Sequence, residues 1–205
     1  MAEKRLTRVE AKARTREQLL DAAARVFAAK GFAGASVEEI AAEAGFSIGA
    51  LYSNFAGKED LFLALMSERA ATRISDTATT LADWHDGAGQ PWRAFGQQMA
   101  EVADKDMDLA PLQAEFWLYA IRHPPVMATF AENVRHRLSD LEDVIAVEVA
   151  REDGDYPEDL PARLAVVVSA LFTGMVRQRR IDPESAPPEL YGDALRWLFR
   201  GAKNE

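Results

Sequence analysis

Apolar residues recur along most of this chain at spacings of three and four, which is the period of an amphipathic helix. The first clear stripe runs from Leu19 to Phe27 and stops before Gly31, a residue that tolerates the left-handed backbone found at helix ends. No segment of convincing length shows the strict alternation of a half-buried strand, and no Asn-Gly hairpin signal occurs. The pattern therefore predicts an all-α protein of about nine helices.

Two short helices follow the first one, and their end signals are unusually clear. A capping box predicts a helix that begins at Val37, because the Ser36 hydroxyl and the Glu39 carboxylate can each accept a backbone N–H of the first turn. Gly45 follows this helix at the position that favours a left-handed residue, and Ser47 is a good N-cap for the next helix. Two helices joined by so short a turn predict a helix-turn-helix.

The second of these helices has two unlike faces. Its apolar side consists of Ile48, Leu51 and Phe55, and its other side is small and polar, with Gly49, Ala50, Tyr52, Ser53 and Asn54. Small residues let a helix backbone approach the major groove of DNA, where polar side chains can meet base edges or phosphates. This helix is therefore the predicted recognition helix, although Ile48 shares the face of Leu51 and could equally be a core residue.

Charge is distributed unevenly along the chain. The net charge is −9, yet residues 1–58 carry nine Lys and Arg against seven Asp and Glu, which leaves +2 there and −11 in the remainder. The basic residues at the N-terminus are Lys4, Arg5, Arg8, Lys12, Arg14 and Arg16. A basic arm directly before a helix-turn-helix favours contact with DNA phosphates, although a merely solvated terminus would have the same composition.

Composition excludes several other classes of protein. Apolar residues make up 48% and charged residues 28%, which is an ordinary globular balance, and the absence of cysteine removes disulfides and thiolate metal sites. The longest apolar run, Leu164 to Val176, is shorter than the roughly 20 residues that span a bilayer, so a buried helix is expected there. No secretory signal is recognisable at the start. We expect a cytoplasmic protein that does not enter membranes.

The head of the chain resembles a known family. Residues 45–61 read Gly-Phe-Ser-Ile-Gly-Ala-Leu-Tyr-Ser-Asn-Phe-Ala-Gly-Lys-Glu-Asp-Leu, which closely resembles the signature of the TetR (tetracycline repressor) family. The resemblance covers roughly Thr15 to Leu65 and includes the hallmark residues Tyr52, Phe55, Lys58 and Leu61. Asn54 departs from the pattern, because many members carry histidine or tyrosine at this position. Beyond Leu65 the chain resembles the family only in the number and placement of its helices.

This resemblance implies both a domain organisation and a set of DNA contacts. Residues 1–57 would form the basic arm and DNA-binding domain, and residues 58–205 the domain that binds an effector and dimerises. Ser36, Tyr52 and Lys58 are the implied phosphate contacts, while Ser47, Ile48, Gly49 and Ser53, with Asn54 beside them, lie where base-facing positions occur. Lys58 also falls in the first turn of a helix, where free N–H groups favour an anion.

The remaining 140 or so residues need a function of their own, and binding a small molecule is the expectation for this family. A ligand cavity requires aromatic and flexible apolar walls with a few polar groups. The candidate lining residues are Phe95, Met99, Glu115, Phe116, Trp117, Tyr119, Phe130 and Met175. Each could instead be a core residue, and Glu115 stands out because a buried carboxylate needs a donor or a cationic ligand.

The last two predicted helices supply the expected dimer interface, as the resemblance implies. Their candidate interface residues are Leu164, Val168, Leu171, Phe172, Leu195 and Leu198, although these faces could also pack entirely within one subunit. A symmetric dimer would present two recognition helices one DNA turn apart and would bind a palindromic operator. The predicted protein is thus a bacterial homodimeric transcriptional regulator, most simply a repressor that a small molecule releases from double-stranded DNA.

Two alternatives belong to different classes. Gly45-Phe-Ser-Ile-Gly49 also matches the Gly-x-Ser-x-Gly nucleophile elbow of hydrolases, but the elbow needs a preceding strand and the pattern here predicts a helix. The dispersed His85, His123 and His136 suggest neither a catalytic triad nor a metal site, so we expect no enzyme activity, metal or cofactor. The other alternative is a helical protein-interaction module without DNA binding, in which the acidic body docks a partner.

Overall fold

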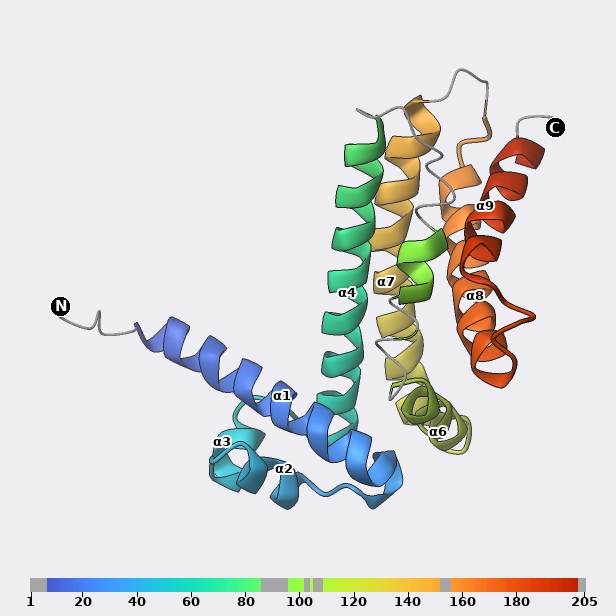
Figure 1. The fold of residues 1–205 in the computed structure, drawn as a ribbon. Helices are drawn as coiled ribbons and strands as arrows, with labels where there is room; N and C mark the ends of the chain where they lie inside the picture. Colours follow the sequence, from blue (N-terminus) through green and yellow to red (C-terminus); the bar gives the residue numbers. More distant parts are fainter. Residues whose placement is uncertain (1–6, 86–95, 102–103, 105–108, 152–155, 203–205) are drawn as a thin grey trace, which may run out of the picture. The chain divides into compact units, whose positions relative to one another are not determined.

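The structure is a computed structural model that describes residues 7–85, 96–101, 104, 109–151 and 156–202. The described residues form helices joined by turns, and none of them lies in a strand, so the predicted all-α fold is confirmed (Figure 1). The helices are α1 Arg8–Gly34, α2 Val37–Glu43, α3 Ile48–Tyr52, α4 Lys58–His85, α6 Leu109–Ile121, α7 Pro124–Arg151, α8 Leu160–Ile181 and α9 Pro188–Ala202. Residues 96–101, between α4 and α6, are also helical.

The chain packs as two compact units that do not correspond to two continuous stretches of sequence. The head unit consists of Met1–Glu68 and Pro111–Phe130, and the body unit of Arg69–Ala110 and Ala131–Glu205. The boundaries between the units therefore fall inside α4, α6 and α7. The predicted division into a DNA-binding domain and an effector domain at residue 58 concerned function and stays a prediction. By packing, most of α6 and the start of α7 belong to the head unit.

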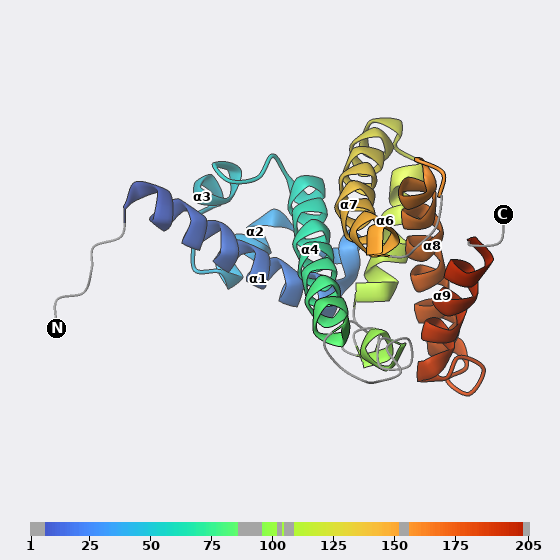
Figure 2. The same ribbon diagram turned by 90° about the horizontal axis from the view of Figure 1, so that it is seen from above.

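Local signals explain the helix ends in the head unit. Ser36 accepts the Glu39 N–H and Glu39 accepts the Ser36 N–H, so the predicted capping box at α2 is confirmed. Gly45 has φ +73°, as expected for the residue that ends α2, and Ser47 caps α3 by accepting the Ala50 N–H at 3.1 Å. Figures 1 and 2 show α1, α2 and α3 grouped as a three-helix bundle.

The head unit has an aromatic core that includes a residue from α6. Phe27, Phe32, Phe62 and Phe116 are each at most 2% exposed, and the rings of Phe62 and Phe116 stack with centroids 4.1 Å apart. Phe32 meets Phe116 edge to face at 5.0 Å. Burying one such side chain contributes about 1.5–3 kcal/mol, and aromatic pairs add about 0.5–1.5 kcal/mol each. Phe116 is therefore an integral part of the core beneath the helix-turn-helix.

The body unit has its own core between α7, α8, α9 and residues 96–101. The buried members of this core are Met99, Ile145, Leu164, Ala165, Val168, Tyr191 and Leu195. Helices α8 and α9 lie side by side in both views (Figures 1 and 2). Among the described helices, α8 has the length and hydropathy of a helix that could cross a membrane. The helix predicted at Leu164 to Val176 corresponds to α8, but the buried residues of α8 are Leu164, Ala165 and Val168, so the expectation of a buried helix holds for one face only.

Candidate nucleic-acid interface and effector cavity

Helix α3 presents one exposed face and buries the other. Leu51 is completely buried, whereas Tyr52 is 53% exposed and Ile48 is 43% exposed. Gly49 and Ser53 are exposed on the same short helix. The open question about Ile48 is thereby answered in favour of the surface. The structure therefore exposes Gly49, Tyr52 and Ser53, which the sequence pattern placed on the polar face, together with Ile48, which it placed on the apolar face.

The serine hydroxyls around α3 have defined partners. Ser36 and Ser47 accept backbone N–H groups at the helix N-termini, and a hydroxyl that accepts in this way keeps its proton for a further acceptor such as a phosphate. Ser53 donates to the Ala50 carbonyl at 2.8 Å. The amide of Asn54 also donates to Ala50, and its Oδ1 is buried with no partner among the described residues. The Asn54 amide nitrogen is thus turned back onto the helix.

Lys58 lies in the first turn of α4, but its ammonium points into the head. Its Nζ donates to the carbonyls of Phe32 at 2.9 Å and Ala35 at 3.0 Å, and it lies 4.7 Å from the centre of the Phe32 ring. These carbonyls belong to the end of α1, where no further helical turn supplies N–H donors. Two of the three ammonium donors of Lys58 are therefore used to join α4 to the turn between α1 and α2.

Glu115 of α6 binds the same turn from another direction. Its Oε2 accepts the Phe32 N–H at 2.8 Å, so the carboxylate proposed from sequence as a ligand group has a donor within the head unit. Gly31, the residue before, has φ +71° and ψ 172°, a backbone that essentially only glycine adopts. A Cβ on Gly31 would lie 2.6 Å from Glu115 Oε2. Glycine is required here for its backbone, and a Cβ would also displace the end of the Glu115 side chain.

A second hydrogen bond joins α6 to α4. The Tyr119 hydroxyl donates to Glu59 Oε1 at 2.8 Å, and this bond, together with burial and the carboxylate charge, raises the pKa of Tyr119. The Tyr119 ring also stacks on His123 with centroids 4.0 Å apart. The turn after α1 and the start of α4 are thus both held by side chains of α6.

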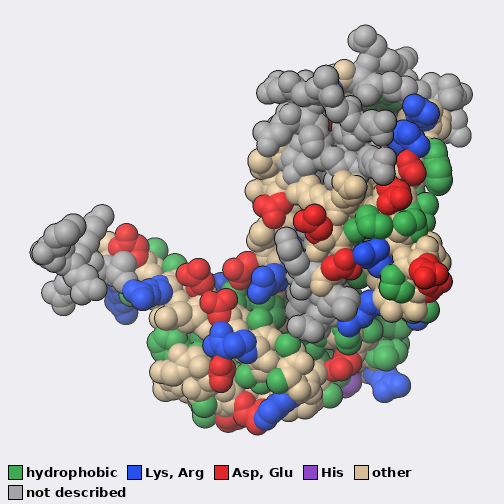
Figure 3. Space-filling view, viewed as in Figure 1, with side chains coloured by type: hydrophobic (Ala, Val, Ile, Leu, Met, Phe, Trp, Pro, Cys, Tyr) green, Lys and Arg blue, Asp and Glu red, His purple; other side chains and the backbone are tan. Residues whose placement is uncertain are grey.

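The surface of the head unit carries both signs of charge. In the view of Figure 3, Lys and Arg side chains alternate with Asp and Glu over this region. Arg25 pairs with Glu43 at 2.8 Å and Lys30 with Glu39 at 2.6 Å, and the hydrogen bond from Lys30 is the main cause that lowers the pKa of Glu39. Pairing reduces the positive charge left for phosphates, so direct contacts from α3 matter more to any DNA binding.

The residues predicted to line a ligand cavity fall into separate places. Phe116, Tyr119 and Phe130 lie in the head unit, where Phe116 meets Phe130 edge to face at 5.5 Å. Trp117 is 51% exposed on α6. Phe95 lies outside the described residues. Only Met99 and Met175 line the cavity that the structure places in the body unit.

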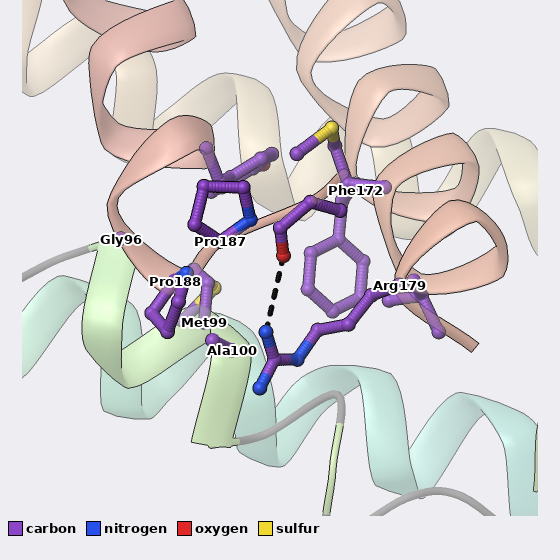
Figure 4. Close-up of a pocket in the computed structure, with 11 residues that line it drawn as sticks. Gly96, Met99, Ala100, Phe172, Arg179, Pro187 and Pro188 are labelled. Carbon is purple, nitrogen blue, oxygen red and sulfur yellow. Dashed lines mark hydrogen bonds between the residues drawn. The ribbon is translucent and has the colours of Figure 1, made fainter. Parts of the chain in front are cut away.

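That cavity lies between residues 96–101, α8 and the start of α9 (Figure 4). It is lined by Gly96, Met99, Ala100, Phe172, Met175, Val176, Arg179, Ala186, Pro187, Pro188 and Tyr191. Its empty volume of about 280 Å³ includes space open to solvent, so the enclosed part is far smaller than a drug-sized ligand pocket. Gly96 is needed for the close packing, because a Cβ there would lie 2.8 Å from the Pro188 carbonyl oxygen.

One charged side chain borders the cavity, and sequence reasoning missed it. Arg179 donates through Nε and Nη2 to the two carboxylate oxygens of Asp104, both at 2.9 Å, and through Nη1 to the Ala186 carbonyl at 3.0 Å. The Arg179 hydrogen bond lowers the pKa of Asp104. Tyr191, also missed, is buried, which raises the pKa of its hydroxyl, and it donates to the Val168 carbonyl at 3.3 Å. Neither residue belongs to a motif that would mark it in the sequence.

The residues predicted for the dimer interface are mainly core residues of the body unit. Leu164, Val168 and Leu195 are at most 8% exposed, and Leu171, Phe172 and Leu198 are partly buried against the same core. The apolar side chains that these two helices expose are Val166, Val167 and Ile181 on α8 and Trp197 on α9. Any contact with a second copy through α8 and α9 would be made first by this exposed set.

Among the described residues no three His, Cys, Asp or Glu side chains are grouped as a metal site requires. The hydrolase alternative also lacks its structural context, because α2 is a helix and Ser47 is the N-cap of α3. A short helix with an exposed face, preceded by two capped helices, is instead the geometry of a helix-turn-helix.

Residues 19–65 match the family model of the bacterial regulatory proteins of the tetR family. The chain is 28% identical over 124 residues to the transcriptional repressor NicS of Pseudomonas putida, a match that covers 60% of this chain and 50% of NicS. It is 42% identical over 65 residues to the repressor AcnR of Corynebacterium efficiens, covering 32% of this chain and 34% of AcnR. The chain thus spans half or less of the curated relatives it matches.

Similarity to solved structures extends over the whole fold. The regulator FadR of Bacillus subtilis, solved in complex with stearoyl-CoA, superposes with a TM-score of 0.58 at 20% identity and covers 89% of this chain and 96% of its own. At that identity the likeness concerns the fold alone. The body unit as well as the head unit therefore has the helical architecture of a known regulator.

Proposed function

We propose that the protein is a ligand-responsive transcriptional regulator that binds double-stranded DNA through α3. The observation that carries this proposal is the exposed face of α3, where Ile48, Tyr52 and Ser53 stand on a short helix whose other side is fixed by the fully buried Leu51. The match of residues 19–65 to the tetR family model and the similarity to repressors support this function, and a repressor is the simplest form of it.

The proposed DNA contacts divide into two groups. Ser47, Ile48, Gly49 and Ser53 would face bases, with Asn54 beside them, and Ser36 and Tyr52 would contact phosphates. Lys58 would contribute to phosphate binding only through the donor that Phe32 and Ala35 leave free. Its larger role would be to position the turn between α1 and α2.

A homodimer would follow from the exposed apolar set on α8 and α9. Val166, Val167 and Trp197, which are 43–58% exposed, would pack against the same residues of a second copy over the buried Leu164, Val168 and Leu195. Two recognition helices roughly 34–36 Å apart would then bind a palindromic operator. The exposed apolar side chains on adjacent helices support this arrangement.

The effector would act through α6. Because α6 begins in the body unit and continues into the head unit, a ligand that displaced its first turn would act directly on Glu115 and Tyr119. Release of the Phe32 N–H and of Glu59 would let the turn after α1 and the start of α4 change position. DNA affinity would fall as the population shifted to this state.

The remaining parts of the proposal are simpler. The protein would be cytoplasmic, would act without a catalytic centre and would need no cofactor other than its effector. FadR, a regulator with the same fold, was solved with a small molecule bound, which supports an effector in the body unit.

Selection from a random DNA library with the full chain, followed by a salt series, tests DNA binding. We expect a palindromic consensus and an affinity that falls steeply with salt concentration, because phosphate contacts release counterions. Tyr52→Ala should weaken binding to all sequences by about tenfold, while Val147→Ala, which truncates an equally exposed apolar residue on α7, serves as the matched control. Failure to retain any DNA at low salt would contradict the proposal and favour a protein-interaction module.

A further inference from the structure

The first half of α1 extends beyond the core of the head unit. None of residues 8–18 is buried, and the first buried residue of the helix is Leu19. Figures 1 and 2 show this segment projecting past α2 and α3. At 1.5 Å per residue it is about 16 Å long, and so short a helix has little stability of its own in water. The segment is therefore held only by the rest of α1 and leaves its side chains available to a partner.

One face of this segment carries a row of basic side chains. Arg8, Lys12 and Arg16 follow one another at steps of four residues, so they lie on the same side of the helix. Further steps of three and four lead from Arg16 to Leu19 and Ala23, both completely buried. The basic row therefore continues the face that α1 turns towards the core of the head unit, beyond the point where that core ends.

The opposite face of the segment has mixed charge. Glu10 and Arg14 are each two residues from Lys12, which places them about 200° around the helix from it. Glu17 lies one turn after Arg14 on this face. None of the cations of the basic row forms an ion pair with an acidic side chain of the described residues. The positive charge of the segment is thus concentrated, unneutralised, on the face turned towards the core.

Arg16 is the member of the row that the fold holds in place. Its guanidinium carbon lies 4.4 Å from the centre of the Phe55 ring, a cation–π contact. Phe55 is 2% exposed and follows Tyr52, the last residue of α3, by three residues. The guanidinium therefore lies near the end of the predicted recognition helix. Its N–H donors make no hydrogen bond to the described residues and remain able to bind a phosphate.

The basic row lowers the stability of the helix as long as nothing neutralises it. Like charges four residues apart repel each other, and cations at the start of a helix oppose its dipole. Arg8 is the first residue of α1 and Lys12 lies one turn further, so both effects act on the same end. A row of anions would turn this cost into a gain. Each strand of B-DNA presents one phosphate per about 3.4 Å of helix axis.

We infer that Arg8, Lys12 and Arg16 bind DNA phosphates that flank the bases contacted by α3. This inference rests on the proposed function, and it assigns the contact to one face of a helical segment instead of to the N-terminal basic residues as a whole. Steps of four residues place the three cations about 6 Å apart, so the row reaches roughly three or four phosphates of one strand. Arg16, positioned by Phe55, aligns the row with α3, and Arg14 makes no specific contact.

The salt dependence of binding to DNA selected with the full chain tests the row. The slope of log affinity against log salt concentration becomes less steep by about 0.9 for each phosphate contact that is lost. Arg16→Gln should change the slope by that amount and weaken binding about fivefold at physiological salt concentration. Arg14→Gln removes the same charge from the same helix and should leave the slope unchanged. Equal effects of the two substitutions would overturn the inference, because the charges would then act only at long range.

Ethylation of single phosphates locates the contacts directly. In the unaltered protein, ethylation of phosphates outside the bases read by α3 should weaken binding, and this interference should disappear with Arg16→Gln. Arg16→Lys keeps the charge but not the flat stacking on Phe55, so it should retain most of the salt slope. Thermal unfolding without DNA checks that each variant is folded. The same ethylation pattern for Arg16→Gln and the unaltered protein would overturn the inference.

Tyr52→Ala distinguishes a failure of this inference from a failure of the proposed function. If the unaltered chain retains no DNA, both are contradicted. If Tyr52→Ala weakens binding while Arg16→Gln behaves like Arg14→Gln, α3 binds DNA and the basic row does not. If Arg16→Gln reduces the slope while Tyr52→Ala leaves the affinity unchanged, the row binds DNA and the proposed role of α3 is wrong.

Discussion

The head unit and the body unit solve the problem of buried polar groups differently. In the head unit, the charged side chains that approach the interior find backbone partners: Lys58 binds two carbonyls and Glu115 an N–H. In the body unit, the cation beside the cavity, Arg179, is held by the Asp104 carboxylate as well as by the Ala186 carbonyl. Each unit also has buried side-chain atoms without a partner among the described residues: Asn54 Oδ1 in the head, and Gln98 Oε1 and Arg196 Nε in the body. The units therefore differ in how they hold charge, because the head relies on backbone groups and the body on a titratable side chain.

This comparison predicts that the head unit depends on a residue from far along the sequence. Phe116→Ala should destabilise it by about 3–5 kcal/mol, because the ring is completely buried between Phe32, Phe62 and Phe130. Urea denaturation measures the loss. Trp117→Ala, which truncates the exposed neighbour on α6, should cost less than about 1 kcal/mol. Similar losses for the two variants would refute the assignment of α6 to the head.

The turn after α1 is the next most sensitive point. Gly31→Ala should cost about 2–3 kcal/mol, because alanine opposes the backbone at φ +71° and its Cβ displaces Glu115 from the Phe32 N–H. Gly34→Ala is the control, since its Cβ would meet Lys30 at an ordinary 3.6 Å. The free energy of unfolding should therefore be lower for Gly31→Ala than for Gly34→Ala. A stable Gly31→Ala variant would mean that the turn adopts another backbone.

Substitution of Lys58 tests whether this residue positions the turn between α1 and α2 or contacts a phosphate. Lys58→Met should lose about 1–3 kcal/mol of stability, because the Phe32 and Ala35 carbonyls lose their donor. The salt dependence of DNA binding separates positioning from phosphate contact. A slope unchanged by the substitution indicates positioning alone, and a slope reduced by about one unit indicates a direct phosphate contact.

The smallest expected effect concerns the satisfied ion pair of the body unit. Arg179 lowers the pKa of Asp104, so the pair stabilises the folded state at pH values above the ordinary carboxyl pKa of 3.8. This contribution is lost as the pH falls below 3.8 and through the lower pKa of the folded state. Asp104 is half exposed, which limits the contribution to about 1 kcal/mol or less. In the Asp104→Asn variant the unfolding temperature should therefore fall less between pH 5 and pH 3 than in the unaltered protein, by an amount that corresponds to about 1 kcal/mol or less. An unchanged pH profile would show that the pair does not contribute.

The parts of the structure that sequence predicts are those with local causes. Ser36, Gly45 and Ser47 determine helix ends through neighbours at most four residues away, and the helix-turn-helix follows from them. An apolar stripe, by contrast, says that a face is buried but not against what. Phe116 was a candidate for a cavity wall and lies in the head core, and Leu164 was a candidate for a dimer interface and lies in the body core.

The charged groups of the body show the same limit. Asp104 and Arg179 are 75 residues apart, and no spacing rule brings them together beside the cavity. Only the folded chain shows that the charged side chain at this cavity is an arginine.

The insertion of residues 111–130 into the head unit has a consequence for protein engineering. A chimera that grafts the head of one regulator onto the body of another through a single junction would place that junction within α4. In this protein such a junction would separate Phe32 and Phe62 from Phe116, and the Phe32 N–H from Glu115. A transferable head would have to include its own residues 111–130. Recombination between relatives would therefore need three compatible junctions, within α4, α6 and α7, instead of one.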